Sequence, residues 1–162
     1  MAAALACMAC SAAHAIDALG VETGIGDDRT AMIRLSVIDR WRKHQNERSD
    51  VWRLAGYWDF SGALWDNSTE STADVGITPV FRVERNALYI EGAIGVHFVQ
   101  ARISAHRSFS TALQFGTHAG AGLHLGKKYD LGVRIQHLSN GHLKQPNPGI
   151  NFALVHLQYA LE

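Results

Sequence analysis

Apolar and polar residues alternate one by one over most of this chain, and this period of two narrowly limits its fold. Successive side chains of a β-strand point to opposite faces, whereas an α-helix needs a period near 3.6. In the clearest run, Leu88, Ile90 and Ile94 share one face, opposite Tyr89 and Glu91. The pattern predicts eight strands, the first of them weaker, within residues 18–25, 33–41, 52–60, 75–84, 88–98, 113–125, 131–139 and 155–161.

The length of these runs favours a membrane barrel. Six of the eight have 9 to 13 residues, against the usual roughly 5–6 of soluble sheets, and they match the roughly 9–11 residues with which a tilted strand crosses a bilayer. We therefore expect an all-β fold, an eight-stranded antiparallel transmembrane β-barrel whose polar interior is filled by side chains. A soluble lipocalin-like barrel, with its apolar face turned inward around a ligand, is the alternative.

The placement of polar and aromatic residues adds detail to the barrel. The polar faces carry both signs of charge, for example Arg82 and Glu91, which can neutralise one another inside. With both termini on the periplasmic side, the loops near residues 26–30, 66–72, 100–112 and 141–150 face outward. Candidates for the aromatic girdles at the membrane interfaces are Trp41, Trp52, Trp58, Trp65 and Tyr159.

The first fifteen residues differ from the rest, being almost wholly Ala, Leu, Met and Cys and ending in Ala13-His14-Ala15. We expect residues 1–15 to be a signal peptide that lacks its basic start, and residues 16–162 to form a single barrel domain. A short buried helix or a lipoprotein signal is the alternative. Both cysteines, Cys7 and Cys10, lie in this segment. The formal net charge is zero, which gives no indication of a nucleic-acid partner.

One residue pair near the end of the chain indicates chemistry. His137 and Ser139 stand two residues apart on a predicted strand, so they share a face. Leu131, Val133 and Ile135 precede them on that face, which is therefore apolar. A histidine beside a serine hydroxyl is the base and nucleophile of serine hydrolases, and polar groups on a lipid-facing surface are functional by default. His-x-Ser alone is a weak signal, but this setting predicts an esterase with an apolar substrate.

The stretch His137-Leu138-Ser139-Asn140-Gly141-His142-Leu143-Lys144-Gln145-Pro146-Asn147 resembles the signature of the lipid A 3-O-deacylase (PagL) family. The resemblance continues through residues 114–118, 120–122 and 129–132. It implies a multi-pass β-barrel of the bacterial outer membrane that hydrolyses the 3-O-linked acyl chain of lipid A (lipopolysaccharide) near the outer leaflet. The product is a 3-hydroxy fatty acid. It further implies that Ser139 is the nucleophile and His137 the general base.

The chain departs from the family at the third catalytic position. The family has a glutamate shortly after the loop, and the matching residue here is Asn151. Parity puts Asn151 on the outward face, across a hairpin from His137. Asparagine can orient a histidine, but it cannot stabilise an imidazolium by charge. The alternatives are an esterase in which Asn151 is the orienting residue and a catalytically impaired or inactive structural or surface-interaction barrel of the same family.

The loop between the last two strands supplies further candidates. Asn140, Gly141 and Asn147 are candidates for stabilising the oxyanion, although these residue types are equally typical of turns. Lys144 is either a ligand for a lipid A phosphate or a solvated loop charge.

No metal and no other cofactor is expected. His118 and His124 share a polar face, but no third metal ligand accompanies them. The expected partners are lipid A (lipopolysaccharide) as substrate and outer-membrane lipid, with no nucleic acid. The sequence leaves the oligomeric state open, a homodimer included.

Overall fold

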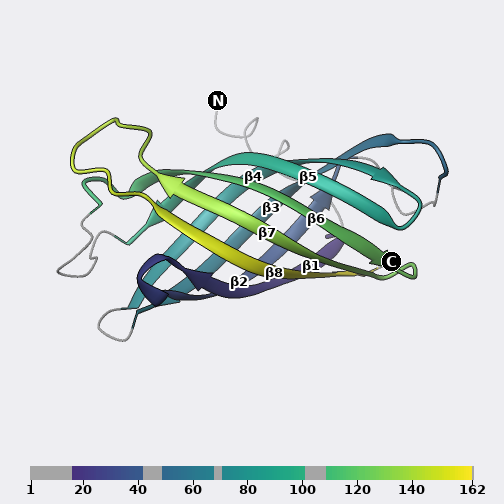
Figure 1. The fold of residues 1–162 in the computed structure, drawn as a ribbon, viewed down its shortest axis with the longest axis horizontal. Helices are drawn as coiled ribbons and strands as arrows, with labels where there is room; N and C mark the ends of the chain where they lie inside the picture. The colour runs from purple at the N-terminus through teal and green to yellow at the C-terminus, as the bar shows by residue number, and fades with distance from the viewer. Residues whose placement is uncertain (1–15, 42–48, 68–70, 101–108, 162) are drawn as a thin grey trace, which may run out of the picture.

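Eight β-strands follow one another along the chain and close into a barrel in the computed structural model (Figure 1). The structure describes residues 16–41, 49–67, 71–100 and 109–161, so the predicted signal peptide lies outside the described residues. The elements are β1 (Ala18–Gly26), the 3-10 helix η1 (Asp27–Arg29), β2 (Ala31–Arg40), β3 (Arg53–Asp66), β4 (Ser71–Arg85), β5 (Leu88–Val99), β6 (Leu113–Leu125), β7 (Tyr129–Ser139) and β8 (Ile150–Ala160). The predicted all-β, eight-stranded fold is confirmed. Among the described residues, no helix is long and apolar enough to cross a membrane.

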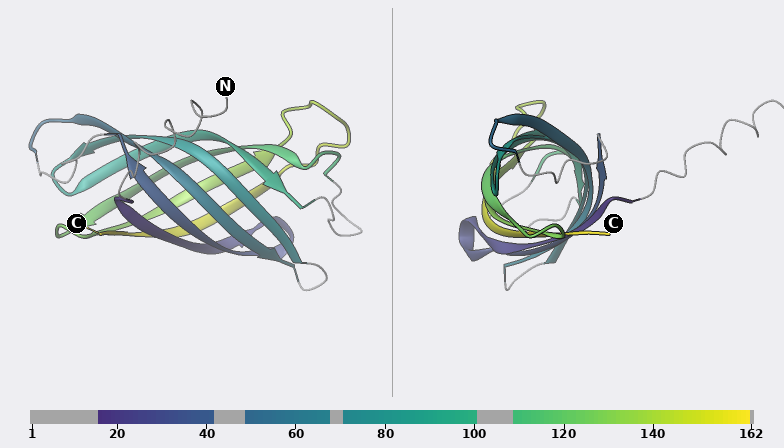
Figure 2. Two further views of the ribbon diagram at one scale, coloured as in Figure 1. Left: turned by 180° about the vertical axis from the view of Figure 1, so that it is seen from behind. Right: turned by 90° about the vertical axis from the view of Figure 1, so that its right-hand side faces the viewer.

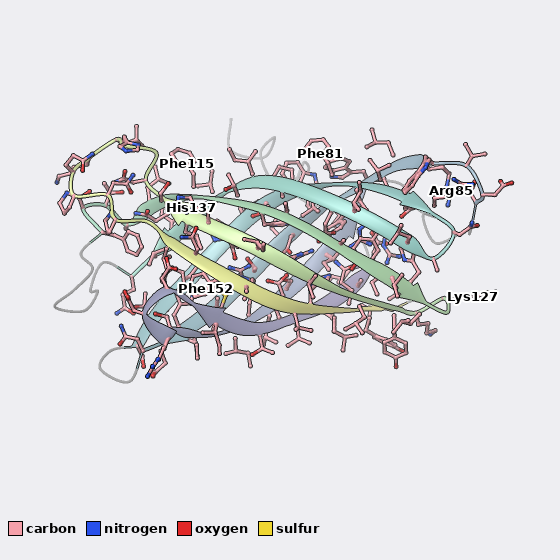
Figure 3. All side chains as sticks on the ribbon, viewed as in Figure 1. Phe81, Arg85, Phe115, Lys127, His137 and Phe152 are labelled. Carbon is pink, nitrogen blue, oxygen red and sulfur yellow. The ribbon has the colours of Figure 1, made fainter. Side chains whose placement is uncertain are left out.

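Closure of the barrel brings the first and last strands together. Each strand pairs antiparallel with the next, and β1 also pairs with β8, with Leu19 opposite Tyr159 and Ile25 opposite Ala153. The view along the barrel shows the closed ring (Figure 2). Because the strands alternate in direction, η1 and the β7–β8 connection lie at the same end, called the loop end below. Lys127 lies at the opposite end (Figure 3).

Apolar side chains cover the outside of the barrel. On β7, Val133 and Ile135 are exposed, whereas Arg134 and Gln136 between and after them are buried. This parity is that of a barrel in lipid, and it excludes the soluble alternative with an inward apolar face. The strands have 9 to 15 residues, enough to cross a bilayer when tilted.

Charged side chains inside the barrel form one connected network. Arg134 binds Glu22 and also Glu91, at 2.6 Å from Nε to Oε1. Arg82 binds Glu91 at 2.9 Å and Asp130 at 2.7 Å. A buried charge is costly unless it is paired and hydrogen-bonded, so the opposite charges make this interior tenable. The polar interior predicted from the strand pattern is confirmed.

The interior becomes apolar toward the loop end, which the alternation did not reveal. The buried cluster there comprises Met32, Ala63, Trp65, Val99, Phe109, Leu138, Ile150, Phe152 and Leu154. The prediction of an interface position for Trp65 is wrong, because Trp65 is one residue out of phase with the exposed Leu64 and points inward. Its ring packs 5.2 Å from that of Phe152 and 6.5 Å from that of Phe109, between centroids.

The other four predicted girdle residues, Trp41, Trp52, Trp58 and Tyr159, are exposed on the outer surface. Trp41 flanks the β2–β3 connection and Tyr159 lies near the end of β8, so both are far from the loop end. Trp41 packs edge-on against Phe81, with 5.0 Å between ring centroids. Exposed, mutually packed aromatic rings of this kind are typical of the interface region of membrane barrels.

Candidate active site

His137 and Ser139 lie on the outer surface at the loop end of the barrel. β7 ends at Ser139, His137 is exposed, and Ser139 is partly exposed. Leu138 between them points inward and is fully buried in the apolar cluster. Figure 3 shows His137 at the end from which the β7–β8 connection extends. The alternation of β7 therefore presents an imidazole and a hydroxyl side by side on a face that is otherwise apolar.

Asn151 holds the imidazole from the neighbouring strand. The register of β7 and β8 sets His137 directly opposite Asn151, and both side chains point outward. His137 Nδ1 lies 2.8 Å from Asn151 Oδ1. Since a carbonyl oxygen only accepts hydrogen bonds, His137 Nδ1 carries the proton in this pair. The other nitrogen, Nε2, is then the basic one, as a general base requires.

A carboxylate that was not predicted from the sequence stands behind Asn151. Asp27 Oδ2 accepts hydrogen bonds from the backbone N–H and the side-chain Nδ2 of Asn151, both at 3.0 Å. Asp27 begins η1, and the pairing of β1 with β8 brings this turn to the start of β8. The acidic turn after the first strand is visible in the sequence and could have suggested a further site residue. Only the closure of the barrel shows which strand that turn meets.

The β7–β8 connection is held by bonds centred on Asn140. The backbone N–H of Asn140 donates to Asn147 Oδ1 at 3.0 Å, and Asn140 Nδ2 donates to Lys144 O at 2.7 Å and to Ser110 Oγ at 2.9 Å. Asn140 is fully buried. Its donors are thus engaged by the loop and by Ser110, which precedes β6, and it shapes the loop beside Ser139. The side chain of Lys144 is exposed, so its ammonium group faces the surroundings of the site.

Two glycines of this connection lie close to aromatic rings. Gly149 has φ +60°, and a Cβ there would come within 2.8 Å of His137 Cε1 and 3.3 Å of His137 Nε2. Gly141 has φ +61°, and a Cβ there would lie 3.3 Å from Phe115 Cδ2. Glycine adopts this left-handed conformation without strain and leaves room for the rings. Gly149 therefore allows the backbone to approach the basic edge of the imidazole.

No hydrogen bond joins Ser139 to His137 within the described part of the chain. Catalytic hydrogen bonds are often long or poorly aligned without substrate and tighten when substrate binds. The structure thus brings together His137, Asn151 and Asp27 through hydrogen bonds, and it brings Ser139 to the same face without a bond to the base. Across residues 16–41, 49–67, 71–100 and 109–161, no three His, Cys, Asp or Glu side chains are grouped to hold a metal ion.

Comparisons with known proteins identify relatives of this chain. Residues 31–160 match the family described as lipid A 3-O-deacylase (PagL). The lipid A deacylase PagL of Pseudomonas aeruginosa is 35% identical over 104 residues, 60% of this chain and 60% of that protein. The lipid A deacylase PagL of Bordetella bronchiseptica is 32% identical over 112 residues, 67% of this chain and 58% of that protein. The match to this chain thus spans less than two thirds of the length of either relative.

Two solved structures resemble the barrel. The crystal structure of the outer membrane enzyme PagL superposes with a TM-score of 0.77 at 28% identity, covering 87% of this chain and 97% of that one. A de novo designed transmembrane β-barrel reaches a TM-score of 0.58 at 10% identity, covering 89% and 93%, a likeness of fold alone. None of these similarities supports the homodimer that the sequence left open.

Proposed function

This chain belongs to the lipid A 3-O-deacylase (PagL) family of outer-membrane β-barrels, and we propose that it is itself a lipid A esterase. It hydrolyses the ester that links the acyl chain at position 3 of lipid A and releases a 3-hydroxy fatty acid. The observation that carries this proposal is the exposed His137, held by Asn151 at 2.8 Å beside Ser139 on an apolar outer face. A substrate embedded in the membrane can reach such a face directly.

In the proposed reaction, Ser139 Oγ attacks the carbonyl carbon of the ester while His137 Nε2 takes the hydroxyl proton. The tetrahedral intermediate collapses as the bond to the sugar oxygen breaks, and that oxygen receives the proton from the imidazolium. Water, deprotonated by the same nitrogen, then attacks the acyl-serine ester. The fatty acid leaves and Ser139 regains its proton, so no cofactor enters the reaction.

Two groups of the loop are suited to stabilise the negative oxygen of the intermediate. Because Asn147 Oδ1 accepts a bond from Asn140, the Nδ2 group of Asn147 is the end that can donate. Gly141 has no side chain that could shield its backbone N–H from the substrate. We assign Asn140 a role in shaping this loop, since its own donors bind Lys144 O within the loop and Ser110 Oγ before β6. Lys144 is exposed and positively charged, which suits contact with a lipid A phosphate.

The test is the release of 3-hydroxy fatty acid from lipopolysaccharide by purified, detergent-solubilised protein, followed by mass spectrometry. Ser139→Ala is expected to reduce release by about ten-thousand-fold or more, because the nucleophile is lost. Ser71→Ala, at the same end of the barrel, is the matched control and should release as the wild type does. Release by Ser139→Ala at the wild-type rate would refute the proposal.

The alternative is a catalytically impaired barrel, which predicts a different result in the same assay. In that case the wild type releases no fatty acid, and Asn151→Glu, which supplies the carboxylate of the family pattern, gains activity. The hydrogen bonds from Asn151 to Asp27 favour the working enzyme, because they give Asn151 a defined orientation toward His137.

A further inference from the structure

We propose that Asp27 is a positioning residue of the active site: it acts through Asn151 to fix the tautomer of His137 and supplies the negative charge that residue 151 lacks. The inference rests on the proposed esterase function and deepens it. It starts from the hydrogen-bonded chain Asp27–Asn151–His137, which joins η1, β8 and β7 at the loop end. Proton transfer between Ser139 and His137 does not by itself require a carboxylate at the head of this chain.

Asp27 sets the orientation of the Asn151 amide. An amide presents an oxygen on one side and an NH₂ group on the other, and it can bind a neighbour in either orientation. An ionised carboxylate only accepts hydrogen bonds, so the NH₂ group of Asn151 must face Asp27 Oδ2. The oxygen of the amide then faces His137. Asp27 thereby selects one of the two orientations of Asn151.

The orientation of the Asn151 amide in turn fixes the tautomer of His137. With Oδ1 of Asn151 2.8 Å from His137 Nδ1, the proton of the neutral imidazole must reside on Nδ1. A reversed amide would offer its NH₂ group to Nδ1 and favour the tautomer with the proton on Nε2. That tautomer cannot accept the proton of Ser139. Serine proteases with asparagine in place of the orienting aspartate lose activity for this reason.

Asp27 also places a negative charge behind Asn151. During the reaction His137 becomes an imidazolium, which a nearby negative charge stabilises. Asn151 is neutral and cannot provide this, but Asp27 stands one hydrogen bond further away and polarises the same amide. The carboxylate that the family resemblance implies at position 151 is in this chain divided between two residues, the amide at 151 and the charge at 27.

The turn that carries Asp27 is built to hold it in place. The backbone carbonyl of Asp27 accepts bonds from Thr30 N at 3.1 Å and Thr30 Oγ1 at 2.8 Å. Gly26 donates to Thr30 O at 2.7 Å, and a Cβ at Gly26 would come within 2.6 Å of Asn151 O. The missing side chain at Gly26 thus lets the turn pack against β8. These contacts fix the carboxylate against Asn151.

The experiment compares Asp27→Ala, Asp27→Asn and the matched control Asp28→Ala, which removes a neighbouring exposed carboxylate. Two readouts are taken on folded protein in micelles: kcat with lipopolysaccharide, and the ¹⁵N NMR shifts of the His137 ring at a pH where it is neutral. The signals of His137 are assigned by their loss in His137→Gln.

The wild type and Asp28→Ala should show one tautomer, with the proton on Nδ1. Asp27→Ala should show both tautomers and lose about a hundred-fold in kcat with little change in KM, less than the about ten-thousand-fold loss seen when a triad's own orienting group is altered. Asp27→Asn should lie between, because an amide can present either its oxygen or its nitrogen to Asn151. This variant keeps the shape of Asp27, so it tests whether Asp27 controls the tautomer of His137 even if Asp27→Ala does not fold.

A single Nδ1–H tautomer in both Asp27 variants would overturn the inference, whether or not activity falls, since Asp27 would then only anchor the turn. Wild-type kcat in both variants would overturn it as well. If the wild type itself releases no fatty acid, the proposed function fails, and the tautomer comparison still decides whether Asp27 controls His137.

Discussion

Among the described residues, four histidines have Nδ1 within hydrogen-bond distance of an acceptor oxygen: His97, His124 and His156 inside the barrel, and His137 on its outer surface. His156 and His137 make the clearest comparison. Inside, His156 lies 3.0 Å from Glu22 Oε1. Outside, His137 lies 2.8 Å from Asn151 Oδ1. Judged by residue type alone, the inner pair is the better catalytic dyad, because its partner is a carboxylate.

The surroundings reverse that judgement. His156 and Glu22 are buried within the charge network, where Arg134 also binds Glu22. No substrate can reach them, and their interactions balance charges that would otherwise be costly inside the barrel. His137 stands exposed among apolar side chains, where a polar group has no structural reason to be. Position relative to lipid, more than residue type, separates the site from the scaffold.

The largest expected effect comes from exchanging the two histidines for glutamine in turn. His137→Gln should lower kcat by about ten-thousand-fold or more, because the proposed base is lost, and leave the barrel folded. His156→Gln should destabilise the barrel by about 1–3 kcal/mol through a lost buried hydrogen bond, with near wild-type activity per folded molecule. The measurement is fatty-acid release divided by the folded fraction from heat-modifiable gel mobility. Equal losses of activity in the two variants would contradict the assignment of His137 to catalysis and of His156 to the fold.

The next effect concerns the interior network. Arg134→Met removes the shared partner of Glu22 and Glu91 and leaves buried carboxylates without it, so the barrel should lose about 3–5 kcal/mol of stability. Arg53→Gln, which alters the more exposed pair with Glu84, should cost at most about 1 kcal/mol. Urea unfolding in micelles, followed by tryptophan fluorescence, measures both. A smaller loss for Arg134→Met than for Arg53→Gln would show that the inner charges do not support the fold.

The smallest effect concerns Gly149. An alanine side chain there would press on the His137 ring, so kcat should fall by about ten-fold, equivalent to about 1.4 kcal/mol of barrier. Gly126→Ala is the matched control, because Gly126 also has positive φ but a Cβ there would meet nothing within 4 Å. Both variants carry similar backbone strain, and only Gly149→Ala is expected to slow hydrolysis. An equal loss in both would attribute it to backbone strain alone.

The sequence predicted the parts of the molecule that depend on neighbours along the chain. Strand parity put His137, Ser139 and Asn151 on the outward face, and the antiparallel hairpin put Asn151 on the strand beside His137. The register that sets the two residues directly opposite each other came from the structure. The same parity predicted that Arg82 and Glu91 lie inside. The inward and outward faces follow locally from a period of two, and the faces observed for these residues are the predicted ones.

The sequence did not predict features that depend on closure. Asp27 is 124 residues from Asn151, and they meet only because β1 pairs with β8 in a defined register. Trp65 was expected at an interface because of its residue type, but its phase on β3 turns it into the apolar cluster beside Phe152. The Asp27–Asn151 contact leaves no pattern within a single strand, whereas the inward position of Trp65 follows from its phase on β3, which the choice by residue type overlooked.

The most direct test of the account is an exchange of the amide and the carboxylate between positions 27 and 151. Asn151→Asp alone sets two carboxylates against each other and should impair hydrolysis, as should Asp27→Asn alone. The double variant, Asp27→Asn with Asn151→Asp, restores one amide and one carboxylate and places the charge directly against His137. We predict that its kcat returns at least to the wild-type value. A double variant no more active than the weaker single variant would contradict the account.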